Sequence, residues 1–161
     1  VLKLVVSIRR WKPQLMLIPA SYERHPDHEA VHALSRRAAF LAGLTKIHTS
    51  DHDGQQTPHR PARMVSYQQF FDLPGGPDFY VDISDTFEAK MSAIRAFASQ
   101  FHVPSEYTSN EPDTLLSRPE FIPSIEARER YYGSRIGTQF AEGFKAVEPL
   151  ALSSLGVLIG D

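Results

Sequence analysis

The stretch QLMLIPASYERHPDHEAVHAL, residues 14–34, contains the pattern that decides the fold. Its first seven residues are a short, nearly continuous apolar run of strand length, which is typical of a strand covered on both faces. A polar loop, SYERHPD, follows this run. Helical spacing of apolar residues then begins near Asp27 or His28. A buried strand, a loop and a helix in this order indicate a parallel α/β sheet.

The segments on either side continue the same succession of elements. The chain opens with apolar residues at loosely helical spacing up to Pro13, and the helix after the loop is predicted to end at Gly43. Strands are predicted in ARMVSYQQFF and DFYVDIS, and a polar loop, TSDHDGQQTPHRP, precedes the first of them. The sequence therefore predicts an α/β fold with a Rossmann-like, mostly parallel sheet and flanking helices.

Two further helices are predicted in the second half of the chain. Asp85 and Glu88 have the spacing of a capping box, and apolar residues recur behind them as far as Phe101. The last helix is predicted over residues 123–140, and a short final strand in PLAL. Small residues recur there at every fourth position: Gly133, Gly137 and Ala141. Because neither a repeat nor a boundary is visible, residues 1–161 are predicted to form a single domain.

Composition narrows the class of protein. The chain has 161 residues, of which 42% are hydrophobic and 22% charged, as in ordinary globular proteins. A net charge of −2 provides no basic surface for nucleic acid, and the absence of cysteine excludes disulfides and thiolate metal sites. Apolar runs are too short to cross a membrane. We therefore expect a cytoplasmic protein with neither nucleic acid nor a membrane as its partner.

Three histidines lie within nine residues, and they have two interpretations as a metal site. Read from His28, the letters HEAVH match H-E-x-x-H, in which His28 and His32 would bind zinc and Glu29 would be the general base. Pro26 argues against this protease interpretation, because a helix can hardly extend upstream of a proline in its first turn. His28 would then lie at the tip of the helix and His32 one turn inside.

Read from His25, the letters HPDH form a loop at the carboxyl end of a sheet strand, where open α/β sheets bind their ligands. Pro26 stiffens this loop, and Asp27 can cap the helix or hold an imidazole N–H. His25 and His28 are three residues apart, so both can face one site. A third interpretation is purely structural and treats these residues as solvated residues around a helix cap.

Longer blocks of sequence make the second interpretation more specific. The block YERHPDHEAVHALSRRAAFLAGL resembles the second metal motif of the PIG-L/LmbE-like zinc deacetylases. The likeness continues in order through PHRP, FYVDIS, KMSAIRAFASQF, RPEFIPSIEARERYYGSRIG and FAEGF. The later blocks look most like the bacillithiol-biosynthesis branch, which deacetylates N-acetylglucosaminyl malate. The resemblance covers nearly the whole chain.

The resemblance implies roles for individual residues. His28 matches the histidine that ligates zinc, and His25 matches a non-ligand histidine that stabilises the tetrahedral oxyanion or protonates the leaving amine. Asp27 matches the carboxylate that orients and charges His25. Arg60, in PHRP, matches an arginine that contacts substrate, although a structural ion pair would explain it equally well. Arg24, next to His25, is a further candidate for substrate binding.

The chain also departs from the family pattern. The family has another motif near its N-terminus, AHPDD followed by an acidic residue, which supplies one histidine and one aspartate to zinc and the general base. This motif is missing here, so the N-terminal strands and the first metal motif are expected to be absent. Val1 in place of methionine favours a fragment over half of a split enzyme or a decayed homologue. Phe121 stands where some relatives have tyrosine, and His32, which matches no ligand, is assigned to packing.

The implied chemistry is amide hydrolysis. Zinc would lower the pKa of a water molecule, and an imidazole would stabilise the oxyanion or protonate the departing amine. The prediction is zinc-dependent removal of the N-acetyl group from an N-acetylglucosaminide, a small sugar amide, by a homo-oligomeric enzyme. With one zinc ligand of three, the chain alone is expected to be inactive. The alternatives are an H-E-x-x-H protease and a non-catalytic binding or oligomerisation module.

Overall fold

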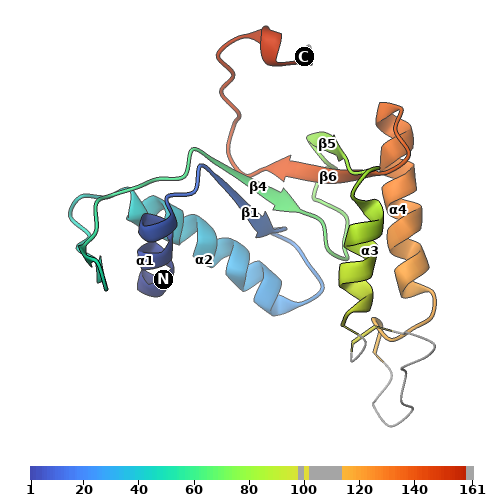
Figure 1. Cartoon of the computed structure of the whole chain (residues 1–161), viewed down its shortest axis with the longest axis horizontal. Helices are drawn as coiled ribbons and strands as arrows, with labels where there is room; N and C mark the ends of the chain where they lie inside the picture. The colour runs from blue at the N-terminus through green and yellow to red at the C-terminus, as the bar shows by residue number, and fades with distance from the viewer. Residues whose placement is uncertain (98–99, 102–113, 159–161) are drawn as a thin grey trace. The chain divides into compact units, whose positions relative to one another are not determined.

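The computed structural model describes residues 1–97, 100–101 and 114–158 (Figure 1). The chain divides into two compact units. Unit 1 comprises Val1–Phe79 and Phe144–Asp161, and unit 2 comprises Tyr80–Gly143. The prediction of a single domain is left open by this division.

Unit 1 has the predicted succession of helix, strand, loop and helix. Its elements are α1 (Leu2–Trp11), β1 (Leu15–Pro19), α2 (Pro26–Ala42), the short strands β2 (Ser50–Asp51) and β3 (Gly54–Gln55), and β4 (Arg63–Tyr67). β1 and β4 pair in parallel, in register from Leu15–Arg63 to Pro19–Tyr67. α2 begins at Pro26, slightly before the predicted start near Asp27 or His28, because proline suits the first turn of a helix.

The two helices of unit 1 pack through small residues. Val5 and Ile8 of α1 contact Ala38, Ala39 and Ala42 of α2, and all five are buried. Next to them lies Arg9 of α1, which is 2% exposed. Its positive charge lies at the C-terminal end of α2, where it interacts favourably with the helix dipole. Its guanidinium donates to three carbonyl groups and a hydroxyl at the C-terminal end of α2 and in the segment after it: Ala42 O at 2.9 Å, Leu44 O at 2.7 Å, Ile47 O at 2.6 Å and Thr49 Oγ1 at 2.8 Å.

The C-terminal part of the sheet differs from the prediction. α4 (Phe121–Ile136) ends before Gly137, whose φ of 76° is left-handed and whose N–H bonds the carbonyl of Gly133. The predicted helix to residue 140 and its stripe of small residues are therefore wrong, since Gly137 is a helix stop. The following residues form β6 (Ala141–Ala146), antiparallel to β4. Residues 149–152, predicted as a strand, have none in the structure.

Unit 2 is held together by an aromatic core. Its elements are α3 (Phe87–Arg95), α4, most of β5 (Phe79–Asp82) and the first half of β6. The rings of Phe87 and Phe140 stack with centroids 3.6 Å apart, beside Met91 and Ile125. α3 ends at Arg95, earlier than predicted. Its N-cap is Thr86, without a side-chain hydrogen bond, so the predicted capping box is not formed.

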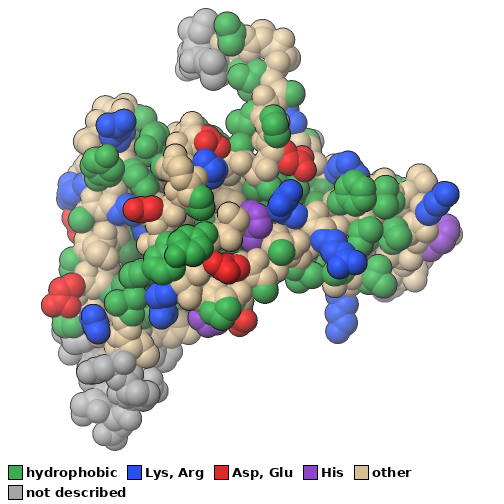
Figure 2. Space-filling model, turned by 180° about the vertical axis from the view of Figure 1, so that it is seen from behind, with side chains coloured by type: hydrophobic (Ala, Val, Ile, Leu, Met, Phe, Trp, Pro, Cys, Tyr) green, Lys and Arg blue, Asp and Glu red, His purple; other side chains and the backbone are tan. Residues whose placement is uncertain are grey.

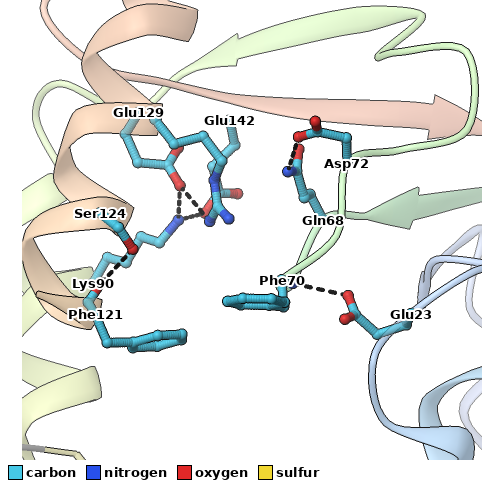
Figure 3. A network of polar contacts seen from close by, with 10 residues as sticks. Glu23, Gln68, Phe70, Asp72, Lys90, Phe121, Ser124, Glu129 and Glu142 are labelled. Carbon is cyan, nitrogen blue, oxygen red and sulfur yellow. Dashed lines mark hydrogen bonds and ion pairs between the residues drawn. The ribbon is translucent and has the colours of Figure 1, made fainter. Parts of the chain in front are cut away.

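A buried ionic network joins the elements of unit 2. Glu129 is 1% exposed, and its Oε1 lies 2.9 Å from Lys90 Nζ and 3.1 Å from Arg128 Nη2. Lys90 also pairs with Glu142 of β6, as Figure 3 shows. Two cations and two carboxylates make this network formally neutral, which limits the cost of burying it.

The strands follow the order β1-β4-β6-β5, and the boundary between the units falls within β5 and β6. The α/β fold with a central sheet and flanking helices is confirmed, and the sheet is mixed. Among the described strands, β4 is the one neighbour of β1, and Leu15 and Leu17 on β1 are 52% and 57% exposed. Apolar side chains reach the surface in several places, next to charges of both signs (Figure 2).

Candidate active site

The candidate site lies in unit 1, at the edge where β1 and β4 end (Figure 1). Because the two strands are parallel, the loop over residues 20–25 and the segment over residues 68–71 follow them at the same edge. α2 also begins there, at Pro26. Burial raises the pKa of Tyr67, the last residue of β4, above that of an ordinary tyrosine. This edge is where open α/β sheets hold their ligands.

Glu23 ties the two segments together. Its side chain is buried, and Oε2 accepts the N–H of Phe70 at 2.8 Å (Figure 3). Oε1 accepts the N–H groups of Arg24 at 2.6 Å and Phe71 at 3.3 Å. The backbone N–H of Glu23 donates to Glu29 Oε1 at 3.0 Å. The three backbone N–H groups compensate the cost of removing the Glu23 carboxylate from water. Because these donors come from both segments, the carboxylate fixes one segment against the other.

His25 is the N-cap of α2. Its Nδ1 accepts the backbone N–H of Asp27 at 3.2 Å, so the neutral ring is assigned the tautomer with hydrogen on Nε2. The nearest carboxylate oxygen of Asp27 is 3.9 Å from Nδ1, beyond hydrogen-bond distance, and both side chains are largely exposed. In the structure, Asp27 therefore contacts the His25 ring through its backbone N–H and not through its carboxylate. The predicted role of its carboxylate stays a prediction.

His28 lies in the first turn of α2, with its ring centroid 5.2 Å from that of His25. Its Nδ1 is buried and has no hydrogen-bond partner among the described residues. Its Nε2 is 3.4 Å from Gln69 Nε2, beyond the end of β4. An unpaired buried ring nitrogen is costly for the fold, and it is the kind of atom that a metal ion would satisfy.

The other two residues of the H-E-x-x-H pattern have structural partners. His32 is 8% exposed, and its Nδ1 donates to the carbonyl of Pro19 at 2.8 Å. Glu29 accepts the N–H of Glu23. Both therefore hold the loop after β1 in place. These contacts favour the packing role of His32 over a role as zinc ligand.

The metal-capable residues that the structure describes do not form a complete zinc site. In the described ranges, the single group of three that converges within 4.8 Å is Asp51, His52 and Asp53, at the turn between β2 and β3. The guanidinium of Arg10 lies 2.5 and 2.8 Å from the ring nitrogens of His52, and this positive charge opposes a cation there. The sequence had placed this group in a loop. At the candidate site, His28 offers one ligand, and zinc needs at least three from protein.

The two arginines predicted to bind substrate lie in different places. The guanidinium carbon of Arg24 is 6.0 Å from the ring centroid of Phe70, at the candidate site. That of Arg60 is 4.7 Å from the ring of Phe40, and its Nη2 donates to the carbonyl of Phe40 at 3.3 Å. Since the 17 residues of α2 span about 25 Å, Arg60 lies near the opposite end of the helix from the histidine pair. Its role in substrate binding stays a prediction.

Three aromatic residues at the same edge were not predicted. Tyr22 and Phe71 stack with ring centroids 5.1 Å apart and planes inclined by 18°, and Phe70 and Phe71 are 5.6 Å apart. The signal in the sequence was an aromatic residue on the segment after each strand. It could not be combined into one cluster before the parallel pairing of β1 and β4 was known.

Comparison with known proteins points to deacetylases. The chain is 31% identical over 153 residues to diacetylchitobiose deacetylase from Thermococcus kodakarensis, covering 93% of this chain and 51% of that protein. The solved structure of N,N'-diacetylchitobiose deacetylase from Pyrococcus horikoshii matches with a TM-score of 0.64 and 26% identity, covering 90% of this chain and 49% of that one. No family model matches the sequence.

Two other solved structures share the architecture. A conserved protein from Thermus thermophilus matches with a TM-score of 0.75 and 30% identity, over 94% of this chain and 59% of that one. The 4-carboxy-2-hydroxymuconate hydratase from Pseudomonas putida matches with a TM-score of 0.68 at 17% identity, over 95% of this chain and 60% of that one, and shows the fold alone.

The chain is thus a homologue of diacetylchitobiose deacetylase, with the α/β fold of that group of structures. It spans about half the length of the deacetylases that it matches. Within the described residues, no helix combines the length and apolar character needed to span a membrane.

Proposed function

We propose that this chain carries part of the active site of a zinc-dependent deacetylase that removes the acetyl group of an N-acetylglucosaminide. The observation that carries the proposal is the pair of His25 and His28 at the carboxyl edge of β1, with His28 Nδ1 buried and unpaired. The relationship to diacetylchitobiose deacetylase supports a sugar amide as the substrate class. Within that class, the sequence blocks favour N-acetylglucosaminyl malate and a role in bacillithiol biosynthesis.

Four residues of this chain would have separate roles in zinc binding, catalysis and substrate binding. His28 would be one ligand of zinc, which generates a nucleophile by lowering the pKa of water when it is bound. Zinc would need further protein ligands in addition to His28. His25 would donate a hydrogen bond from Nε2 to the developing oxyanion or, when protonated, give a proton to the leaving amine. Arg24, and Arg60 by resemblance, would bind the substrate.

The same proposal includes a cytoplasmic location and assembly into a homo-oligomer. The experiment that tests its centre measures zinc content and amine release, using N-acetylglucosaminyl malate and diacetylchitobiose as substrates. Both the 161-residue chain and the product of the complete native coding sequence are needed. We expect the native product to bind zinc stoichiometrically and to release amine, and His28→Ala to lose both.

The matched control is His32→Gln, which keeps a side-chain donor for the carbonyl of Pro19 and is expected to retain zinc. Loss of zinc from His32→Gln together with Glu29→Gln inactivity would instead favour the H-E-x-x-H protease. Absence of zinc and of amine release from the native product would favour the non-catalytic binding module.

A further inference from the structure

We propose that Tyr22, Phe70 and Phe71, here called the aromatic shelf, bind the pyranose ring of a sugar substrate beside His25 and His28. This inference rests on the proposed function and assigns a substrate-binding subsite to three aromatic residues to which the sequence motif gives no role.

The aromatic shelf is next to both histidines. Phe70 directly follows Gln69, whose Nε2 lies 3.4 Å from His28 Nε2. On the other segment, Arg24 directly precedes His25, and its guanidinium carbon lies 6.0 Å from the centroid of Phe70. A ligand on the shelf would therefore be within reach of the two imidazoles and of the Arg24 guanidinium.

The shelf has the features of a preformed binding surface. Tyr22 is 57% and Phe70 36% exposed, although their rings touch Phe71. Single exposed aromatic residues are ordinary, but a contiguous cluster next to converging polar groups is typical of ligand sites. The buried carboxylate of Glu23 fixes the backbone N–H groups of Phe70 and Phe71. A rigid backbone beneath exposed rings lowers the entropic cost of binding.

The chemistry of the shelf suits a pyranose ring. An aromatic face carries a partial negative charge, and the axial C–H groups of a sugar present a slightly positive apolar face to it. The hydroxyl groups at the rim of the sugar can bind Arg24, whose guanidinium has five N–H donors, and the side-chain amide of Gln69. In the proposed complex, the acetamido group would be the substituent directed toward His25 and His28.

Trp11 provides a matched control. It is 76% exposed and, like Phe70, has an arginine over its ring, with Arg10 at 5.8 Å. It lies just before the amino end of β1, whereas the shelf follows the carboxyl end. Trp11→Ala therefore removes an exposed aromatic ring with an arginine partner while leaving the candidate site intact.

The experiment measures binding of methyl N-acetyl-β-glucosaminide by saturation-transfer difference NMR, together with KM and kcat for amine release from the native gene product. Tyr22→Ala and Phe70→Ala should each weaken binding and raise KM about tenfold, with kcat nearly unchanged. Tyr22→Phe and Trp11→Ala should bind like the parent protein. Circular dichroism establishes that each variant is folded. If Tyr22→Ala does not fold, Tyr22→Ser replaces it, because Tyr22 is exposed and tolerates a polar side chain.

The outcomes separate this inference from the proposed function. Weakened sugar binding in the shelf variants, without amine release from the parent, supports the shelf and contradicts the deacetylase. Amine release with unchanged KM in Tyr22→Ala and Phe70→Ala overturns the shelf and leaves the deacetylase standing. Equal loss of binding in Trp11→Ala also overturns it, because the effect is then not specific to this edge.

Discussion

The carboxylate of Glu23 accepts the backbone N–H of Phe70 at 2.8 Å, across 47 positions of sequence. This bond joins the segment after β1 to the segment after β4, and the candidate site is assembled from both. The parallel pairing of the strands brings the two segments to one edge, and Glu23 then fixes their distance. The geometry around His28 thus depends on a residue that is not part of the HPDH motif.

Replacing Glu23 by glutamine should loosen this junction. An amide has one acceptor oxygen in place of two, so at least one of the N–H groups of Arg24, Phe70 and Phe71 loses its bond. We expect a loss of about 1–3 kcal/mol in the free energy of unfolding, measured by urea denaturation. Glu88→Gln, on an exposed position of α3, is the control and should change stability little. Equal stability of the two variants would contradict the role of Glu23.

Replacing Arg9 by methionine should destabilise the end of α2. The change keeps much of the apolar volume but removes the guanidinium donor from the carbonyls of Ala42, Leu44 and Ile47. Ala42 O and Leu44 O keep one backbone N–H donor each, whereas the bond to Ile47 O is lost. The expected loss is about 3 kcal/mol in the free energy of unfolding, with faster hydrogen exchange in the last turn of α2. Arg37→Met, at an exposed position of the same helix, should cost less than about 0.5 kcal/mol. Unchanged exchange in Arg9→Met would show that the cap contributes nothing.

The ionic network of unit 2 should respond non-additively to substitution. Lys90→Met leaves the buried carboxylate of Glu129 with Arg128 as its cationic partner, and should cost about 3–5 kcal/mol. The double variant Lys90→Met, Glu129→Leu removes the uncompensated charge and should recover part of that loss. Thermal and urea unfolding of the two single variants and the double variant measure the coupling. Strictly additive losses would show that the pair does not interact.

Asp82 should titrate below the range of an ordinary aspartate. The Ser84 hydroxyl, at 2.6 Å from Oδ1, and the Ser84 backbone N–H, at 2.9 Å, stabilise the charged form and lower the pKa of Asp82. Its stabilising effect is therefore present above the usual pKa of about 3.9 and is lost as the pH falls through the lowered value. Ser84→Ala should raise the pKa, as measured by NMR titration of the carboxyl carbon. Ser92→Ala, on α3, is the control.

The first half of the fold could be predicted because its signals are local. The apolar run of β1 and the proline in the first turn of α2 each specify one element without reference to distant residues. β6 could not be predicted in the same way. The residues AEGFKA lack a strong alternation, and they become a strand through pairing with β4. Gly137 was interpreted as part of a helical face, whereas its left-handed backbone ends the helix.

The candidate site shows the same division between local and long-range information. HPDH was visible because His25, Asp27 and His28 are neighbours in sequence, and the structure keeps them together. Glu23 and the aromatic shelf were not visible, because their contacts cross from one strand end to another. That Glu23 and the aromatic shelf lie at one edge of the sheet can be recognised only when the register of β1 and β4 is known.

The exposed edge of β1 has a consequence for handling the protein in solution. A strand with one neighbour in the described sheet, and with Leu15 and Leu17 half exposed, offers both an open row of backbone groups and apolar side chains. Such an edge templates pairing with other polypeptides, so colloidal stability should fall as the protein concentration rises. A lysine in place of Leu17 would act as a gatekeeper, keeping samples monodisperse at concentrations where the parent chain scatters light.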